Sequence, residues 1–225
     1  MAIAYKILEN IPFEIDMAAF LADMRVKPGS RRDGLCRTLV QQVNDTAKPK
    51  VGWIEAVVDT VDSCGMVLSG QRFEGSLFEG RLVQGQKVYP FLSTCGLEIG
   101  DFDQQFGTDV LQQYWADCLM EKVLRYASDA LEKELSTAID DEFLACFNPG
   151  SLPVWPLIEQ RPLFQLLGDI VPILGVTLTD HCLMLPQKTV SGFYFSAMTE
   201  YHNCELCPRL RCPTRTTEFI GNCSR

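Results

Sequence analysis

Hydrophobic residues near the start of the chain follow two different spacings. Apolar and polar residues alternate over Tyr5–Ile15, which predicts a first strand with Ile11-Pro12 as a turn or edge within it. After a turn at Lys27–Ser30, apolar residues recur at helical spacing from Asp33, whose side chain we expect to cap the first helical turn. These apolar residues are Leu35, Leu39, Val40 and Val43. The pattern predicts a strand followed by an amphipathic helix.

The next segment is apolar and regularly interrupted by glycine. We expect a short helix over Trp53–Val61 and a strand over Gly65–Leu68. Glycines then recur every five residues, at Gly70, Gly75, Gly80 and Gly85. A phosphate-binding loop needs closely spaced glycines followed by Lys and Ser or Thr at a helix start, so this spacing instead predicts short helices or strands ending in glycine. The apolar run Lys87–Gly96 is typical of a β-strand.

One long helical pattern follows, from Asp103 to about Ala145, and neither Gly nor Pro interrupts it after Gly107. Its apolar face consists of Trp115, Leu119, Val123, Tyr126, Ala127, Ala130, Leu131 and Leu135. Such a stripe predicts core packing rather than a cofactor-binding face. Charged residues such as Glu132 and Lys133 are interpreted as part of a solvated outer face.

The last third of the chain mixes turns with short elements. We expect a turn at Phe147–Gly150, a short helix over Leu163–Leu167, and strands over Gly175–Leu178 and Thr189–Ser196. Because strands precede and follow one long helix, instead of alternating with helices, the order of elements predicts an α+β fold.

Composition narrows the classes of function. The chain has 225 residues, of which 47% are hydrophobic, enough for one large domain or two small ones with a substantial core. Its net charge of −9, with no long run of one sign, disfavours nucleic acid as a partner. Charged residues near the start are atypical of a secretory signal, and no apolar run approaches the ~20 residues that span a bilayer. We therefore expect a cytoplasmic protein that does not associate with membranes.

Ten cysteines are many for a cytoplasmic chain of this size. Six are isolated among apolar or small residues and are expected to be small buried side chains. These six are Cys36, Cys64, Cys95, Cys118, Cys146 and Cys182. Because exposed thiols oxidise readily, this richness also fits a cell that lives without oxygen.

The remaining cysteines form a separate group near the C-terminus. Cys204, Cys207 and Cys212 follow a Cys-x2-Cys-x4-Cys pattern, with Cys223 further along and His202 just before. Such spacing lets thiolates converge on a zinc ion or an iron-sulfur cluster, and the prolines after Cys207 and Cys212 favour the cluster. A disulfide or unligated thiols are the alternatives. We divide the chain into a domain over residues 1–202 and a cysteine-rich tail over residues 203–225.

Several motifs resemble the activation domain of vitamin B12-dependent methionine synthase and its stand-alone relatives in anaerobes. Asn148-Pro149-Gly150 resembles that family's Pro-Gly turn, and Glu159–Leu167 resembles its helix with a Phe-x-Leu-Leu ending. Gly175–Thr179 resembles its Gly-x-x-Leu-Thr strand. The run Met184–Ser196 resembles its Met-x-Pro segment leading into Ser-Gly-aromatic-Tyr-Phe-Ser, and Tyr89–Gly96 is a fainter match.

The resemblance implies a single α+β domain with a twisted antiparallel sheet and one long helix. It also implies that the domain binds S-adenosylmethionine and supports the reductive methylation of a corrinoid, cobalamin, carried by a separate methionine synthase or related methyltransferase. Glu159 would hold the amino group of the ligand, and Tyr194 would stack on it or donate a hydrogen bond. The implied ligand-binding residues are Asn148, Pro149, Gly150, Glu159, Arg161, Ser191, Gly192 and Tyr194.

The chain departs from the family pattern at one charged position. Where the family has an arginine that pairs with the ligand carboxylate, this chain has Cys146, and a thiol cannot form that bidentate pair. Arg161 is a candidate to supply the missing charge from the neighbouring helix. The departure favours an alternative function, a non-catalytic partner-binding or scaffold protein that kept the fold and uses its tail as a structural metal site. Both functions remain open from the sequence.

Overall fold

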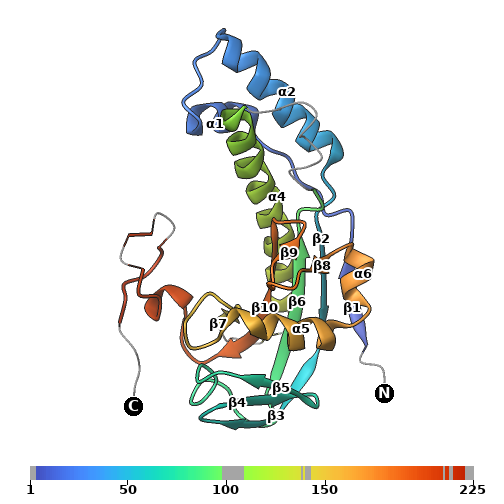
Figure 1. Ribbon diagram of the computed structural model, residues 1–225, viewed down its shortest axis with the longest axis vertical. Coiled ribbons are helices and arrows are strands. Elements are labelled where there is room, and N and C mark those ends of the chain that lie inside the picture. Colours follow the sequence, from blue (N-terminus) through green and yellow to red (C-terminus); the bar gives the residue numbers. More distant parts are fainter. Residues whose placement is uncertain are drawn as a thin grey trace.

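The structure is a computed structural model that describes residues 4–97, 109–137, 139, 143–209, 211–212 and 215–220. Within these residues, eight strands join into one antiparallel sheet, which occupies the centre of the molecule (Figure 1). The strands of this sheet are β1 (Tyr5–Leu8), β2 (Lys50–Ile54), β3 (Ala56–Asp62), β4 (Gly65–Leu68), β5 (Gln71–Glu74), β6 (Lys87–Thr94), β7 (Phe143–Phe147) and β10 (Thr189–Ala197).

Strand β6 is the centre of the sheet. One of its edges pairs with β2 along its C-terminal half and with β3 at its N-terminal end, and its other edge pairs with β10. Strand β10 pairs in turn with β7, in the register Phe193↔Phe147 and Tyr194↔Cys146. Strands β7 and β10, far apart in the chain, are therefore neighbours at one side of the sheet.

Helices cover both faces of the sheet and extend beyond it. The α-helices are α1 (Met17–Asp23), α2 (Arg31–Thr46), α4 (Val110–Ser136), α5 (Gln160–Leu167) and α6 (Ile170–Leu174). Helix α4 runs from the sheet to α1 and α2 at one end of the molecule, while α5 and α6 lie across the sheet (Figure 1). A two-stranded ribbon of β8 (Thr177–Leu178) and β9 (Met184–Leu185) follows α6. In the described part of the chain, no helix is both long and apolar enough to cross a membrane.

Alternating side chains of the sheet belong to two separate cores. Phe147, Phe193 and Phe195 join a core that includes residues of α5 and α6. Cys146 and Tyr194, on the intervening positions, pack with Leu131 and other residues of α4. This follows from strand geometry, because successive side chains of a strand point to opposite faces. A third core joins α1 and α2 to the first half of α4.

The fold class predicted from the sequence is confirmed: helices and an antiparallel sheet form a single domain with one long helix. Helix α4 also carries the expected apolar stripe, although Tyr126 on that stripe is partly exposed. The strands over Gly65–Leu68 and Thr189–Ser196 and the helix containing Leu163–Leu167 are confirmed.

Four expected elements differ in the structure. One is the strand over Gly175–Leu178, which is shortened to β8 because Gly175 caps the end of α6 in a left-handed conformation. Trp53–Val61 is not a helix but the end of β2 and most of β3. The long helix ends at Ser136 instead of Ala145, because Phe143–Phe147 pairs with β10 as strand β7. The first strand is shorter than expected and ends at Leu8. Part of the expected long helix, residues 103–108, lies outside the described residues.

Two smaller expectations also need correction. Helix α2 begins at Arg31, and its N-terminal cap is Ser30, whose hydroxyl accepts a hydrogen bond from the Asp33 backbone N–H at 3.2 Å. Of the six cysteines expected to be buried, Cys64 is exposed, because it lies in the tight turn between β3 and β4. Cys118 and Cys146 are only partly buried.

Candidate functional site

Asn148 joins three parts of the chain at the end of β7. Its side-chain amide donates to the carbonyl oxygen of Ser191 in β10 at 2.9 Å. Its side-chain oxygen accepts a hydrogen bond from the amide of Asn203 at 3.1 Å. The residue therefore fixes the exit of β7 against both β10 and the segment that follows β10.

The predicted Pro-Gly turn follows directly. The backbone N–H of Gly150 donates to the carbonyl oxygen of Trp155 at 2.9 Å, and Pro149 is buried. Gly150 has a φ of +81°, and a Cβ at this position would lie 2.8 Å from Cδ1 of Leu157. Because the backbone is left-handed and the Leu157 side chain lies close, glycine is the residue that fits.

Ser191 and Gly192 set the position of β10 against its neighbours. The Ser191 hydroxyl donates to the side-chain oxygen of Gln160 at 2.8 Å, and both side chains are buried. A Cβ on Gly192 would overlap the carbonyl oxygen of Phe147, so the missing side chain lets the β7 backbone approach. These two predicted residues therefore position the strands around the turn.

Tyr194 and Cys146 lie side by side on the face of the sheet that packs against α4. The Tyr194 hydroxyl donates to Oε1 of Glu132 in α4 at 2.7 Å, and the Cys146 thiol lies 3.7 Å from the side-chain oxygen of Asn148. Burial is the main cause that raises the pKa of the Tyr194 phenol and of the Cys146 thiol well above their ordinary values. Both groups are therefore uncharged at neutral pH.

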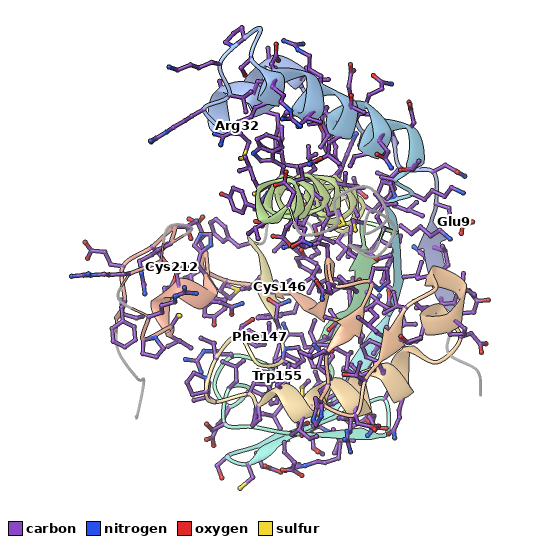
Figure 2. The ribbon with its side chains drawn as sticks, turned by 45° about the horizontal axis from the view of Figure 1, so that its top comes forward. Glu9, Arg32, Cys146, Phe147, Trp155 and Cys212 are labelled. Atoms are coloured by element: carbon purple, nitrogen blue, oxygen red, sulfur yellow. The ribbon has the colours of Figure 1, made fainter. Side chains whose placement is uncertain are left out.

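A cavity of about 360 Å³ opens at this position, between the end of α4, strand β7 and the segment after β10. Cys146, Tyr194 and Glu132 line one part of it. Its other polar lining groups are those of Ser136, Glu200, Tyr201, His202 and Asn203. In Figure 2, Cys146 lies between α4 and Phe147, with Trp155 further toward α5. The cavity thus combines an aromatic ring and a thiol with carboxylates and an amide.

Glu159 and Arg161 make their hydrogen bonds elsewhere. Oε2 of Glu159 accepts the backbone N–H of Glu74 in β5 at 2.8 Å, and the residue is only 8% exposed. Burial is the largest influence on the Glu159 carboxyl and raises its pKa. The Arg161 guanidinium donates to the carbonyl oxygen of Asp180 at 2.9 Å. Of the eight predicted residues, Tyr194 is the one that lines the cavity beside Cys146, whereas Glu159 and Arg161 bond to backbone atoms outside its described lining.

Apart from Tyr194, the lining residues are missing from the ligand-binding set predicted by the sequence, and three of the polar ones are instructive. Glu132 was interpreted as part of a solvated face, yet it is bonded to Tyr194. Glu200 and Asn203 follow β10 in an irregular segment and carry no motif, so no sequence signal pointed to them. A polar residue near the end of a long helix, such as Glu132, can be recognised as part of a site only when the strand that it faces is known.

A larger cavity of about 710 Å³ lies on the opposite side of β7. Phe147, Phe195 and Tyr201 contribute aromatic rings to its lining, together with residues of the loop over Gly80–Gln86. Tyr201 lines both cavities, because it packs against Phe147 with ring centroids 5.3 Å apart at the side of the sheet.

The cysteine-rich tail is folded around one arginine. The Arg215 guanidinium donates to the backbone carbonyl oxygens of Cys204, Cys207 and Arg209 at 2.7 to 2.9 Å. The Thr216 hydroxyl lies 3.7 Å from the Cys204 sulfur, toward which it donates. Arg215 thereby holds the turn that carries the first two cysteines of the motif.

The geometry expected of a metal site is not found in the described part of the tail. Among the described residues, no group of three or more His, Cys, Asp or Glu side chains lies together as metal ligation requires. Cys223, the fourth predicted ligand, lies outside the described residues. Ligation by Cys204, Cys207, Cys212 and Cys223 therefore stays a prediction.

Comparison with solved structures gives a likeness in fold. A solved structure described as the MetH reactivation domain bound to AdoHcy superposes with a TM-score of 0.58 and 15% sequence identity. The likeness covers 89% of this chain and 81% of that one, and at this identity it establishes the fold. No protein-family model matches the chain. No curated protein matches it either.

Proposed function

We propose that this chain binds S-adenosylmethionine and supports the reductive methylation of a corrinoid cofactor, cobalamin, on a separate methionine synthase or related methyltransferase. The observation that carries the proposal is the fold shared with the MetH reactivation domain bound to AdoHcy over 89% of this chain. AdoHcy is S-adenosylmethionine without its methyl group, so that protein's site accepts the same class of ligand. The sequence motifs around Asn148 and Tyr194 support the same conclusion independently.

The cavity beside Cys146 and Tyr194 is the proposed ligand site. Its volume of about 360 Å³ lies within the range of small-molecule pockets. The Tyr194 hydroxyl binds the Glu132 carboxylate, which offers an acceptor for the ligand's amino group. Behind this wall, Asn148 and Gly192 hold β7 against β10.

In this role the protein contributes placement. Holding the methyl donor in one orientation converts an encounter with the corrinoid into a positioned transfer, which is a large part of what a binding protein adds to a reaction. The corrinoid, when bound to its carrier, supplies the nucleophile. Burial keeps the Cys146 thiol and the Tyr194 phenol protonated, so neither competes as a nucleophile for the methyl group.

Calorimetric titration of anaerobically prepared protein with S-adenosylmethionine tests the proposal. We expect saturable binding that Tyr194→Phe weakens, because the phenol orients the Glu132 carboxylate. Glu159→Gln separates two placements of the ligand, since it keeps an acceptor for the Glu74 N–H. Unchanged affinity in Glu159→Gln assigns the ligand to the cavity, whereas lost affinity assigns it to the Glu159 carboxylate. Absence of binding by folded protein would remove the proposed function.

A second candidate function is a partner-binding or scaffold protein that kept the fold without the ligand. Two observations favour it: Cys146 occupies the family's arginine position, and Glu159 and Arg161 are bonded to backbone atoms. The same titration decides between the two functions. A folded protein that binds neither S-adenosylmethionine nor AdoHcy but elutes with a corrinoid methyltransferase in gel filtration would have the scaffold role.

We extend the proposal to the tail, whose four cysteines would hold zinc or an iron-sulfur cluster. The supporting observation is the cysteine spacing, with a turn held by Arg215. Metal analysis of anaerobically purified protein tests it, with Cys204→Ser and Cys64→Ser as matched variants. We expect near-stoichiometric metal that only Cys204→Ser removes. Metal-free protein with an intact C-terminus would exclude the metal site.

A further inference from the structure

The cavity beside Cys146 has an unusual balance of charge. Two carboxylates, those of Glu132 and Glu200, line it, and its described lining contains neither lysine nor arginine. The imidazole of His202 is the basic group present, and its Nε2 lies 3.1 Å from Oε1 of Glu200. A ligand that enters therefore meets two acidic groups and a basic group that already faces one of them.

One oxygen of the Glu132 carboxylate is bound by a side chain of the sheet. Its Oε1 accepts the hydrogen bond from Tyr194, and the Tyr194 side chain is only 6% exposed. An ionised carboxylate has about four acceptor positions, of which this bond uses one. The bond orients Glu132 at the cavity wall and leaves acceptor positions for a ligand. A preoriented acceptor binds a cation at a smaller entropic cost than a mobile side chain does.

The rest of the described lining offers no lysine or arginine to compensate these carboxylates. Cys146 is uncharged, since burial keeps its thiol protonated. Asn203 is uncharged, and its side-chain amide donates to the side-chain oxygen of Asn148 at 3.1 Å. A ligand carboxylate placed here would lose part of its hydration without gaining a charged partner, and it would be repelled by Glu132 and Glu200. A sulfonium or ammonium group placed here would be attracted by both.

We propose that this cavity selects the positively charged end of adenosyl ligands, so that it prefers a sulfonium to a neutral thioether and tolerates a ligand carboxylate only where it points to solvent. The inference rests on the proposed function and names the ligand class of the same site. It predicts that the methylated ligand, S-adenosylmethionine, binds more tightly than AdoHcy, the product of methyl transfer. The site would then release its product because the positive charge has left with the methyl group.

The test compares three adenosyl compounds by calorimetry at low salt and pH 7.5. Decarboxylated S-adenosylmethionine carries a sulfonium and an ammonium, S-adenosylmethionine adds a carboxylate, and AdoHcy lacks the sulfonium charge. We expect affinity to fall in that order, by about fivefold at each step, the size expected of partly exposed ion pairs. The ratios should shrink as salt is added, because salt screens exposed charges.

Two variants on the same helix isolate the cause. Glu132→Gln removes one charge and keeps an acceptor for the Tyr194 hydroxyl, so the preference for S-adenosylmethionine over AdoHcy should fall, and Glu200 should account for the part that remains. Glu134→Gln makes the same change on an exposed residue of α4 outside the cavity lining and should leave the ratio unaltered. Cys146→Arg adds a cation to the wall, which would pair with a ligand carboxylate. This variant should therefore bind S-adenosylmethionine more tightly than decarboxylated S-adenosylmethionine, the reverse of the order expected for the wild type.

The outcomes separate this inference from the proposed function. Equal affinities for S-adenosylmethionine and AdoHcy in the wild-type protein would overturn the charge selection and leave the binding function standing. If Glu132→Gln and Glu134→Gln lowered the ratio of the affinities for S-adenosylmethionine and AdoHcy equally, the inference would also be overturned. A general effect of net charge would then explain the preference. Failure of folded protein to bind any of the three compounds would remove the proposed function itself. If Cys146→Arg does not fold, the Glu132 and Glu134 pair still decides.

Discussion

The two faces of the sheet differ sharply where β7 and β10 meet. Toward α5, Phe147 and Phe195 stack with ring centroids 4.5 Å apart, and Trp155 packs on Phe193 at 4.9 Å. Toward α4, the neighbouring position of β7 holds Cys146 at a polar cavity. Adjacent residues of one strand thus belong to a closely packed aromatic core and to a candidate ligand site.

This difference shows how one sheet can serve stability and binding separately. The aromatic face gains stability from apolar area removed from water and from close packing. The face toward α4 has an apolar core along α4, but near its end it relies on hydrogen bonds such as that of Tyr194 with Glu132. Because side chains alternate along each strand, residues can change on one face with little effect on packing at the other. Stability measurements on each face test this separation.

The largest effect is expected on the aromatic face. Phe147→Ala removes a fully buried ring that contacts Phe78 and Phe195, so the free energy of unfolding should fall by about 3–5 kcal/mol. Phe143→Ala, on the same strand but half exposed, should cost less than about 1 kcal/mol. Urea unfolding followed by tryptophan fluorescence measures both. Similar losses in the two variants would contradict the dependence of this loss on burial of the ring.

A smaller loss is expected from the buried polar pair on the aromatic face. Ser191→Ala removes the hydroxyl that donates to the Gln160 side chain and leaves that buried amide oxygen without a donor. The free energy of unfolding should fall by about 1–3 kcal/mol. Gln160→Met in the same background should restore part of the stability, because the unsatisfied amide is gone. A double-mutant cycle by urea unfolding gives the coupling, and additive effects would show that the bond contributes nothing.

On the face toward α4, Tyr194→Phe tests a single hydrogen bond. The phenol donates to an exposed carboxylate, so its loss should lower the free energy of unfolding by only about 0.5–1.5 kcal/mol. Glu132→Gln keeps an acceptor and should cost less than Tyr194→Phe. If Tyr194→Phe instead destabilises the protein as much as Phe147→Ala, the polar face carries as much stability as the aromatic one.

The smallest effect is a pH dependence at Glu159. Burial raises the pKa of its carboxyl in the folded state, so its contribution to stability is fully present below the unfolded pKa of about 4 and is lost as pH rises through the folded pKa. Glu159→Gln removes this titration and keeps an acceptor for the Glu74 N–H. The melting temperature of the wild type minus that of Glu159→Gln should therefore decrease from pH 4 to pH 7. A difference that is constant with pH would contradict a raised pKa.

The helical parts of the fold were easier to predict than the strands. The apolar residues of α4 recur at a spacing that only a helix places on one face, and Trp115, Leu119 and Val123 are all buried there. Trp53–Val61 was wrongly expected to be a helix because it joins the end of β2, which is buried on both faces, to β3, whose alternation is interrupted by a bulge between Val58 and Thr60. A strand covered on both sides shows no alternation, and its short apolar run cannot be distinguished from a helix by periodicity.

The candidate site was predicted only in part, for a related reason. Asn148, the Pro-Gly turn, Ser191 and Gly192 lie at the junction of β7 and β10, where local motifs marked them. Glu159 and Arg161 were drawn from the same motifs, but their side chains bond to backbone atoms near β5 and β8. A motif identifies a residue in the chain, whereas the direction of its side chain depends on the elements that pack around it.

The sequence by itself determined the α+β class, the long helix and the turn after β7, because each depends on local spacing, on glycine or on proline. The tertiary structure decided which side chains share a cavity. Tyr194 meets Glu132 across 62 residues of chain, and Asn148 meets Ser191 across 43. Strand pairing and helix packing create such contacts between distant segments. The hydrophobic pattern of one segment does not identify the segment that will pack against it.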